Sequence, residues 1–130
     1  MIGLDTSAII DLLRGNASIK KVLEKNHGPL AATMMSYLEL SFGLDTKNQR
    51  HKNEEDKCDA FFESLHVFNF DKTCCKKSAE IFWHLKEEGG TIEKNDCTIA
   101  GILLTNGITT IITKNEKHFK KIPQLKVISY

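Results

Sequence analysis

Ile2-Gly3-Leu4-Asp5-Thr6-Ser7 is the stretch around which the chain is organised, and it leads directly into the helical run Ala8-Ile9-Ile10-Asp11-Leu12-Leu13. An apolar start that ends in Asp predicts a buried strand turning at once into a helix. In open α/β sheets, ligands bind beyond the carboxyl ends of the strands, where we expect Asp5 to lie. Two interpretations fit this stretch. Asp5 is either a metal ligand or a helix cap, since Asp, Thr and Ser all satisfy free N–H groups at a helix start.

Strands and helices alternate along the rest of the chain. Apolar runs predict further strands at 30–33, 67–70, 108–113 and 127–128. Helical spacing predicts helices at 7–14, 17–25, 35–44, 54–65, 73–88 and 117–121, and another that begins at Asn95 or Asp96. In the helix at 73–88 we expect Ala79, Phe82 and Trp83 to point inward. This alternation predicts an α/β fold of three layers, α/β/α, with a central, mostly parallel sheet of about five strands. We expect one domain spanning residues 1–130.

Composition narrows the class of protein. The 130 residues are 41% hydrophobic and 27% charged, as in an ordinary soluble globular domain. The formal net charge of +1 gives no overall attraction to nucleic acid or membrane, so a nucleic-acid site must be local. The early strand leaves no room for a signal peptide, and no apolar run approaches the roughly 20 residues of a membrane helix. We therefore expect a cytoplasmic protein. Its four cysteines, Cys58, Cys74, Cys75 and Cys97, lack zinc-ligand spacing and are expected to be reduced and mostly packed.

Two more carboxylates occupy unusual positions. Glu39 is the only charge in Met34–Leu44, and Met35 and Phe42 make its helix face apolar. Either it pairs with a lysine or faces solvent at a helix edge, or it is a metal ligand facing Asp5. Asp96 stands at the start of a helix with an apolar body. It is either a first-turn acid that meets the helix dipole or a second ligand.

Asp5, Glu39, Asp96 and the stretch Thr113–Glu116 each lie at a predicted strand end or in the helix just after it. If they converge on one edge of the sheet, the acids repel, and a hard divalent cation such as Mg²⁺ or Mn²⁺ is the usual remedy. Thr6 and Ser7 would then cap the helix and leave Asp5 free. No glycine-rich phosphate loop is present, so bound metal would meet a phosphate group. Two ions about 3.5–4 Å apart can clamp an in-line displacement.

Four motifs, in order and at the usual chain length, resemble PIN domains, and within them the VapC-like toxins of bacterial and archaeal toxin–antitoxin pairs. They are Asp5-Thr6-Ser7, Ser36-Tyr37-Leu38-Glu39-Leu40 with Gly43, Asn95-Asp96 with Ile99-Ala100, and Thr113-Lys114-Asn115 with Phe119. The resemblance implies an Mg²⁺-dependent endoribonuclease in which Asp5, Glu39 and Asp96 bind the metal that activates the attacking water. Thr6, Ser7 and Thr113 would support these ligands by hydrogen bonds.

The fourth acidic position of the family departs from the common pattern. Many relatives carry an acid where this chain has Asn115, and others carry Asn. An Asn side chain offers a carbonyl oxygen but no charge, so a second ion would be weakly held or absent. Glu116 is the alternative, although neighbouring residues in an extended segment point in different directions.

The resemblance also implies partners. These are an RNA substrate, a small antitoxin that inserts a side chain toward the acidic pocket, and a second copy in a homodimer. The helices near Asp45–Phe62 resemble the surfaces used for these contacts. Candidate RNA contacts are Arg14, Lys114 and Lys117, with His118 as a proton donor and with the basic residues Lys120, Lys121 and Lys126 nearby. The alternatives are a solvated basic face and, for Arg14, an i,i+3 pair with Asp11.

Two other functions fit parts of the pattern. A receiver-type phosphoacceptor domain would phosphorylate a strand-end Asp and use a lysine such as Lys114, but the acid pair beside Asp5 is missing. A catalytically inactive interaction module would keep the fold alone. The acids Asp5, Glu39 and Asp96 argue against that, and Asn115 argues mildly for it.

Overall fold

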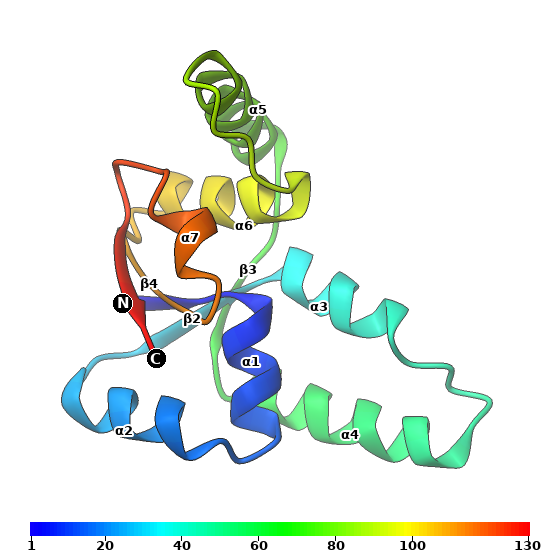
Figure 1. Ribbon diagram of the computed structural model, residues 1–130. Coiled ribbons are helices and arrows are strands. Elements are labelled where there is room, and N and C mark those ends of the chain that lie inside the picture. Colours follow the sequence, from blue (N-terminus) through cyan, green and yellow to red (C-terminus); the bar gives the residue numbers. More distant parts are fainter.

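The first strand lies at the centre of the sheet. The computed structural model describes residues 1–130, and its strands are β1 (Ile2–Leu4), β2 (Leu30–Thr33), β3 (His66–Phe68), β4 (Thr110–Thr113) and β5 (Lys126–Ser129) (Figure 1). The strand order is β3-β2-β1-β4-β5, and every neighbouring pair is parallel. The order reverses between β1 and β4. Ligands bind at such switch points, and Asp5 directly follows β1 there.

Helices cover both faces of this sheet, as Figure 1 shows. They are α1 (Thr6–Leu13), α2 (Ala17–Lys25), α3 (Met34–Phe42), α4 (Gln49–Glu63), α5 (Lys72–Glu87), α6 (Lys94–Thr105) and α7 (Glu116–Phe119). One apolar cluster joins Ile111 of β4 to α5 and α6, and the other joins Ile112 to α1, α2 and α4. Consecutive strand residues point to opposite faces, so adjacent isoleucines supply both cores. The predicted three-layer α/β/α fold with a five-stranded parallel sheet is confirmed.

Close contact between α5 and α6 fixes the position of α6. A Cβ atom on Gly101 would lie 2.8 Å from the backbone nitrogen of Ser78 and 2.9 Å from its Cα, closer than packed atoms tolerate. Glycine lets the two helix backbones approach at this point. Because Asp96 lies in the first turn of α6, this contact also helps to place a candidate site residue.

Helices α3 and α4 form an arm that extends away from the sheet (Figure 1). The Tyr37 hydroxyl donates to Asp59 Oδ1 at 2.5 Å, and the Tyr37 ring meets Phe62 edge to face at 5.1 Å. The hydrogen bond to Asp59 raises the pKa of Tyr37 to about 12, so the phenol stays a donor at neutral pH. These contacts join the two helices of the arm.

Two details of the helix predictions are wrong. Helix α4 begins at Gln49 rather than at the predicted residue 54, because the Asn48 side chain accepts hydrogen bonds from the backbone nitrogens of its first turn. Ala79 and Trp83 of α5 do not point inward, since Ala79 is exposed and Trp83 is 56% exposed, whereas Phe82 packs against the core. The buried face of α5 is made by Cys74, Ser78, Ile81 and Leu85.

The prediction of reduced, mostly packed thiols is confirmed. All four cysteines are free, and Cys75 is the exposed one. No helix has both the length and the apolar character needed to cross a membrane.

Candidate functional site

Asp5 is the most enclosed of the predicted acidic site residues, with 1% of its surface exposed. Its Oδ1 accepts hydrogen bonds from the Ala8 backbone nitrogen (2.9 Å) and the Ser7 hydroxyl (2.8 Å). Its Oδ2 accepts one from the Thr113 hydroxyl at 2.6 Å. The expectation that Thr6 and Ser7 would replace Asp5 as the cap is therefore wrong. A carboxylate has about four acceptor positions, so capping still leaves room for a further ligand.

Two hydroxyl groups connect Asp5 to the chain that follows β4. The Ser7 hydroxyl donates to Asp5 and accepts from the Lys114 backbone nitrogen at 3.1 Å. The Thr113 hydroxyl donates to Asp5 and accepts from the Asn115 backbone nitrogen at 2.8 Å. Because each backbone nitrogen occupies an acceptor position of its hydroxyl, each O–H is directed at the carboxylate. The predicted supporting role of Ser7 and Thr113 has this geometric basis.

Asp96 lies in the first turn of α6 and is 8% exposed. Its Oδ2 is 2.7 Å from Nδ1 of His118 in α7. His118 was expected to be a proton donor, and here its ring pairs with Asp96 and leaves the carboxylate's other oxygen for another ligand. The helix begins at Lys94 with Glu93 as the N-cap, so neither Asn95 nor Asp96 opens it. Asp96 is the predicted first-turn acid, and its negative charge meets the positive end of the helix dipole.

The electrostatics of Asp5 and Asp96 are unfavourable in the absence of a cation. Burial raises the pKa of Asp5, and its hydrogen bonds from Thr113, Ala8 and Ser7 oppose this rise only in part. The charge of Asp96 adds a further, smaller rise to the Asp5 pKa. Burial also raises the pKa of Asp96, against the hydrogen bond and charge of His118. A positive charge bound between these acids would favour their ionised forms.

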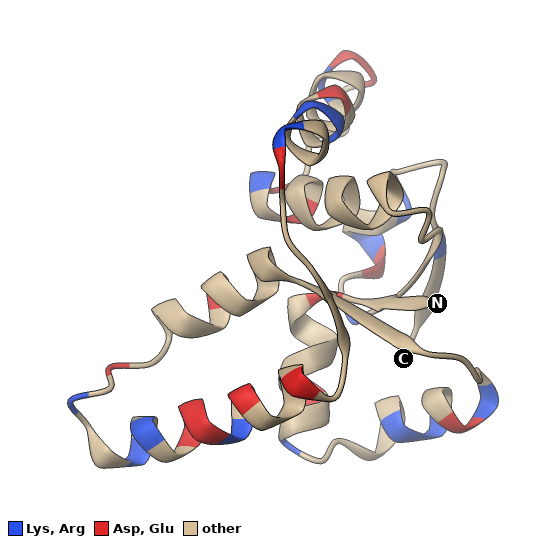
Figure 2. Ribbon diagram, turned by 180° about the vertical axis from the view of Figure 1, so that it is seen from behind, with Lys and Arg blue, Asp and Glu red and all other residues tan.

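Glu39 approaches the same region from α3 and is half-buried. Figure 2 shows α3 as an almost uncharged ribbon with one acidic band, in contrast to the mixed charges of α4. Glu39 Oε1 accepts from the Thr6 hydroxyl at 2.8 Å, and that hydroxyl lies 2.9 Å from Ser36 Oγ. A carboxylate can only accept, so Thr6 donates to Glu39. The partner of Glu39 is thus a hydroxyl on α1 rather than the lysine considered from the sequence.

The residues that follow β4 differ in whether their side chains are paired within the chain. Asn115 is exposed at the start of α7, and its side chain makes no capping hydrogen bond. Glu116 forms an ion pair with Lys120 on its own helix, and the hydrogen bond from Lys120 lowers the Glu116 pKa. Glu116 is therefore engaged away from Asp5. Lys117 is exposed.

Asp11 and Tyr130 lie next to the site, although the sequence analysis did not assign them to it. Asp11 does not pair with Arg14, because its Oδ2 accepts from the Tyr130 hydroxyl at 2.7 Å and lies 3.7 Å from Lys114 Nζ. Arg14 is exposed. The signal for Asp11 was an acid on the buried face of α1, three residues after Ala8. No local pattern in the sequence marks Tyr130.

The donor groups fit a hard divalent cation with a large share of water ligands. As the side chains stand, no three His, Cys, Asp or Glu residues gather closely enough to hold a metal ion. Mg²⁺ commonly binds through one or two carboxylates and keeps several waters. The oxygen atoms of Asp5 and Asp96, two buried acids that repel each other, meet that requirement.

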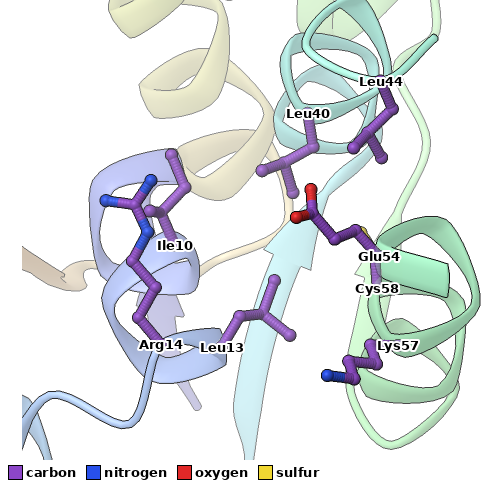
Figure 3. Close-up of a pocket in the computed structure, with 8 residues that line it drawn as sticks. All are labelled: Ile10, Leu13, Arg14, Leu40, Leu44, Glu54, Lys57 and Cys58. Atoms are coloured by element: carbon purple, nitrogen blue, oxygen red, sulfur yellow. The ribbon is translucent and has the colours of Figure 1, made fainter. Parts of the chain in front are cut away.

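An apolar groove of about 300 Å³ lies between α1, α3 and α4. Figure 3 shows Ile10 and Leu13 on one side and Leu40 and Leu44 on the other, with Cys58 at the α4 wall. The charged residues of its lining are Arg14, Lys57 and Glu54. Helix α4 lies within the stretch Asp45–Phe62 that the sequence analysis associated with partner binding.

Comparisons with known proteins agree with this fold. The family model of the PIN domain matches residues 2–125. Ribonuclease VapC of Rickettsia bellii is 31% identical over 132 residues, which cover 97% of this chain and 93% of that protein. Ribonuclease VapC2 of Rickettsia felis is 30% identical over 105 residues, covering 81% and 76%. The crystal structure of VapBC2 from Rickettsia felis bound to a promoter DNA fragment has a TM-score of 0.83, with 27% identity and 100% and 99% coverage.

Proposed function

This chain belongs to the PIN domain family and to its VapC ribonucleases, and from that premise we propose that it is a metal-dependent endoribonuclease, the toxin of a toxin–antitoxin pair acting in the cytoplasm. One observation carries the proposal. Asp5 is buried directly after β1 at the switch point of the sheet, Asp96 is buried in the first turn of α6, and burial raises the pKa of both carboxyl groups. Capping and the helix dipole account for where these acids lie, and a cation site is the further use that two buried acids with raised pKa values indicate.

Asp5 and Asp96 are the proposed Mg²⁺ or Mn²⁺ ligands, with Glu39 as the third acid, tied to α1 through Thr6. A bound ion would polarise the phosphodiester and lower the pKa of the attacking water. Thr113 and Ser7 hold the Asp5 oxygens in place, and His118 holds Asp96. Outer hydrogen bonds of this kind fix the direction of a metal ligand.

The catalytic set includes Asn115 as a neutral member. Its side chain brings no charge, and Glu116 is occupied by Lys120. We therefore assign one firmly held ion to this site rather than two. The RNA contacts are Lys114, Lys117 and Arg14, all exposed and basic, and each would bind backbone phosphates with a strength that falls as salt rises.

The structure gives no support to the receiver-type alternative. The neighbours of Asp5 are hydroxyl groups, and the Lys114 ammonium is paired with Asp11. The inactive-module alternative depends on Asn115 alone, whereas Asp5 and Asp96 are both present and buried.

The test is cleavage of mixed structured RNAs by the purified protein in Mg²⁺ and in EDTA. We expect cleavage in Mg²⁺, none in EDTA, and none from Asp5→Asn or Asp96→Asn, while Asp56→Asn behaves as wild type. Asp56 is an exposed acid of α4 and serves as the matched control. Cleavage that survives EDTA or both site substitutions would contradict the mechanism.

The antitoxin partner is assigned to the groove between α1, α3 and α4. Its lining is mostly apolar, and the positive charges of Arg14 and Lys57 outnumber the single negative charge of Glu54. A partner segment with two or three apolar side chains and a nearby carboxylate fits that chemistry. The groove begins at α1, the helix capped by Asp5, so a bound segment can extend toward the acidic pocket.

The second copy of a homodimer is assigned to two exposed apolar stripes. Met34, Leu38 and Phe42 recur every fourth residue on α3, and Cys75, Ala79 and Trp83 do so on α5. Both helices follow neighbouring strands, β2 and β3, in which Thr33 pairs with Phe68. Phe42 is 81% exposed, which is unusual for a phenylalanine on a regular helix. A second protomer that covers both stripes would bury this surface.

A further inference from the structure

Asp11 is a buried acid outside the proposed metal-binding set. It lies on the inner face of α1 and is 8% exposed. Its Oδ2 accepts a hydrogen bond from the Tyr130 hydroxyl at 2.7 Å and lies 3.7 Å from the Lys114 ammonium. A buried carboxylate needs compensating partners, and here one phenol and one ammonium share a single oxygen atom.

The strand register explains why these two partners meet at Asp11. Thr113 of β4 pairs with Ser129 of β5, so Lys114 and Tyr130 are the first residues beyond two adjacent parallel strand ends. They leave the sheet at the same level and both reach α1. The arrangement is therefore a consequence of the sheet rather than of a flexible loop.

Lys114 is connected to the acidic pocket at its main chain as well. Its backbone nitrogen donates to Ser7 Oγ at 3.1 Å, and Ser7 donates to Asp5. The side chain of Lys114 remains 61% exposed while its ammonium is held at Asp11. A basic group is thus held beside Asp5 and is still accessible from solvent.

Tyr130 is a firm support for Asp11. It packs against the apolar cluster that contains Leu4 and Ile9. Burial raises the pKa of Tyr130 above its ordinary value, and the hydrogen bond and charge of Asp11 add to that rise. The phenol therefore stays protonated at neutral pH and donates to Asp11.

We propose that Asp11 is a positioning residue that holds the Lys114 ammonium beside the Asp5 pocket, where the ammonium binds a phosphate of the RNA, and that Tyr130 holds Asp11 in place. This role rests on the proposed ribonuclease function. A lysine that is free in solvent gives up rotamer freedom when it binds a phosphate. Holding it in place beforehand reduces that loss and strengthens binding without any new contact.

The experiment compares Asp11→Asn, Tyr130→Phe, Lys114→Gln and the double variant Asp11→Asn with Lys114→Gln. Lys20→Gln is the matched control, because Lys20 is an exposed lysine on α2 that has no part in the proposal. Binding of a fluorescein-labelled single-stranded RNA is titrated in EDTA at several salt concentrations. KM and kcat for its cleavage are then measured in Mg²⁺.

We expect each single variant to weaken RNA binding and raise KM by about threefold to tenfold, with kcat nearly unchanged, as for the loss of a phosphate contact. The slope of the logarithm of the RNA-binding constant against the logarithm of salt concentration should be shallower by about one unit in Lys114→Gln. Lys114→Arg should restore the wild-type slope. Asp11→Asn should add nothing in the Lys114→Gln background, because it acts through that lysine. Lys20→Gln should match wild type.

The positioning role would be overturned if Asp11→Asn weakened RNA binding equally in the wild-type and the Lys114→Gln backgrounds. It would also be overturned if Lys114→Gln bound RNA as tightly as wild type. If Asp11→Asn does not fold, Tyr130→Phe replaces it in the cycle, since the phenyl ring keeps its packing. RNA binding through Lys114 without cleavage in Mg²⁺ would contradict the ribonuclease function and leave the positioning role supported. Cleavage without coupling would contradict the positioning role alone, and absence of both binding and cleavage would overturn both.

Discussion

The carboxyl edge of β1 and β4 and the outer faces of α3 and α5 are opposite kinds of surface. At the edge, polar side chains are buried and their hydrogen bonds are made within the chain, as between Asp5 and Thr113. On the outer faces, apolar side chains such as Phe42 and Trp83 are exposed and lack cover from the chain itself.

The difference teaches which parts of the function one protomer can supply. Buried polar groups with satisfied hydrogen bonds are rigid, and rigid ligands suit a metal site. Exposed apolar stripes are stabilised only by covering them. We therefore propose that the single chain builds the site apart from its cation, and that a second protomer covers the outer faces. The predictions below test each side of this comparison.

The largest expected effect is at Asp96. Asp96→Asn should reduce RNA cleavage by about a hundredfold or more, because a charged ligand that stabilises several kcal/mol of developing charge is lost. The same change should raise Tm in EDTA at pH 8. Burial raises the pKa of Asp96 in the folded state, so ionising it as pH rises lowers stability, and Asn removes that loss.

The advantage of Asp96→Asn in Tm should therefore shrink as pH falls toward the ordinary Asp pKa of about 3.9. Thermal unfolding in EDTA at several pH values measures this, with the exposed Asp56→Asn as control. Equal Tm values for Asp96→Asn and wild type at pH 8 would show that ionised Asp96 carries no such penalty.

The next effect concerns the hydroxyl that fixes Asp5. Thr113→Val keeps the shape of the side chain but leaves Asp5 Oδ2 without its 2.6 Å donor. We expect a loss of about 1–3 kcal/mol in the free energy of unfolding, measured by urea denaturation. The Thr113 hydrogen bond lowers the Asp5 pKa, so its loss should move the acidic limb of the pH–activity profile to higher pH.

Thr110→Val is the control for this substitution, because Thr110 is in the same strand and is only half-buried. A profile that stays in place, or equal destabilisation by both changes, would remove the special role of Thr113.

Asp96 and Thr113 also show how much of the site can be predicted from the sequence. Asp5, Glu39 and Asp96 could be chosen from the sequence because each acid stands at a strand end or on an apolar helix. The hydrogen bond from Thr113 to Asp5 joins residues 108 apart, and no local pattern predicts the rotamers that make it. For the same reason the pairing of His118 with Asp96 emerged only in three dimensions.

The predicted inward orientation of Ala79 and Trp83 on α5 is wrong for a different reason. This helix has two stripes with nearly the same spacing, one made by Cys74, Ser78, Ile81 and Leu85 and the other by Cys75, Ala79 and Trp83. Hydrophobic periodicity shows that a stripe is covered but not whether its own core or a partner covers it. Trp83 is the larger side chain, so it was assigned to the core, although Ser78 and its neighbours occupy that place.

A crossed pair of variants separates the two proposed partner surfaces. Phe42→Ser should weaken self-association about tenfold or more, since a buried aromatic side chain is a typical interface anchor. Leu13→Ser, in the groove, should instead reduce capture of the proposed antitoxin. Phe42 is 81% exposed, so Phe42→Ser should change stability by less than about 0.5 kcal/mol, whereas Leu13 is only 37% exposed and Leu13→Ser should cost about 1 kcal/mol.

Analytical ultracentrifugation and pull-down after co-expression measure these two outcomes. The assignment of separate surfaces fails if Phe42→Ser alone abolishes antitoxin capture, or if Leu13→Ser alone dissociates the protein into monomers.

The smallest effect is at the Cys75 thiol, which changes no function but reports on the outer face of α5. Cys75 is the exposed cysteine, whereas burial raises the pKa of Cys58 and Cys97 and slows their reaction. If a second protomer covers this face, Cys75 should react several-fold faster with iodoacetamide in Phe42→Ser than in wild type. Mass spectrometry of the labelled peptides measures both rates, and the buried thiols serve as the internal reference. Equal Cys75 rates at a concentration where wild type is dimeric would place the second protomer on α3 alone, because a thiol under an interface cannot remain fully reactive.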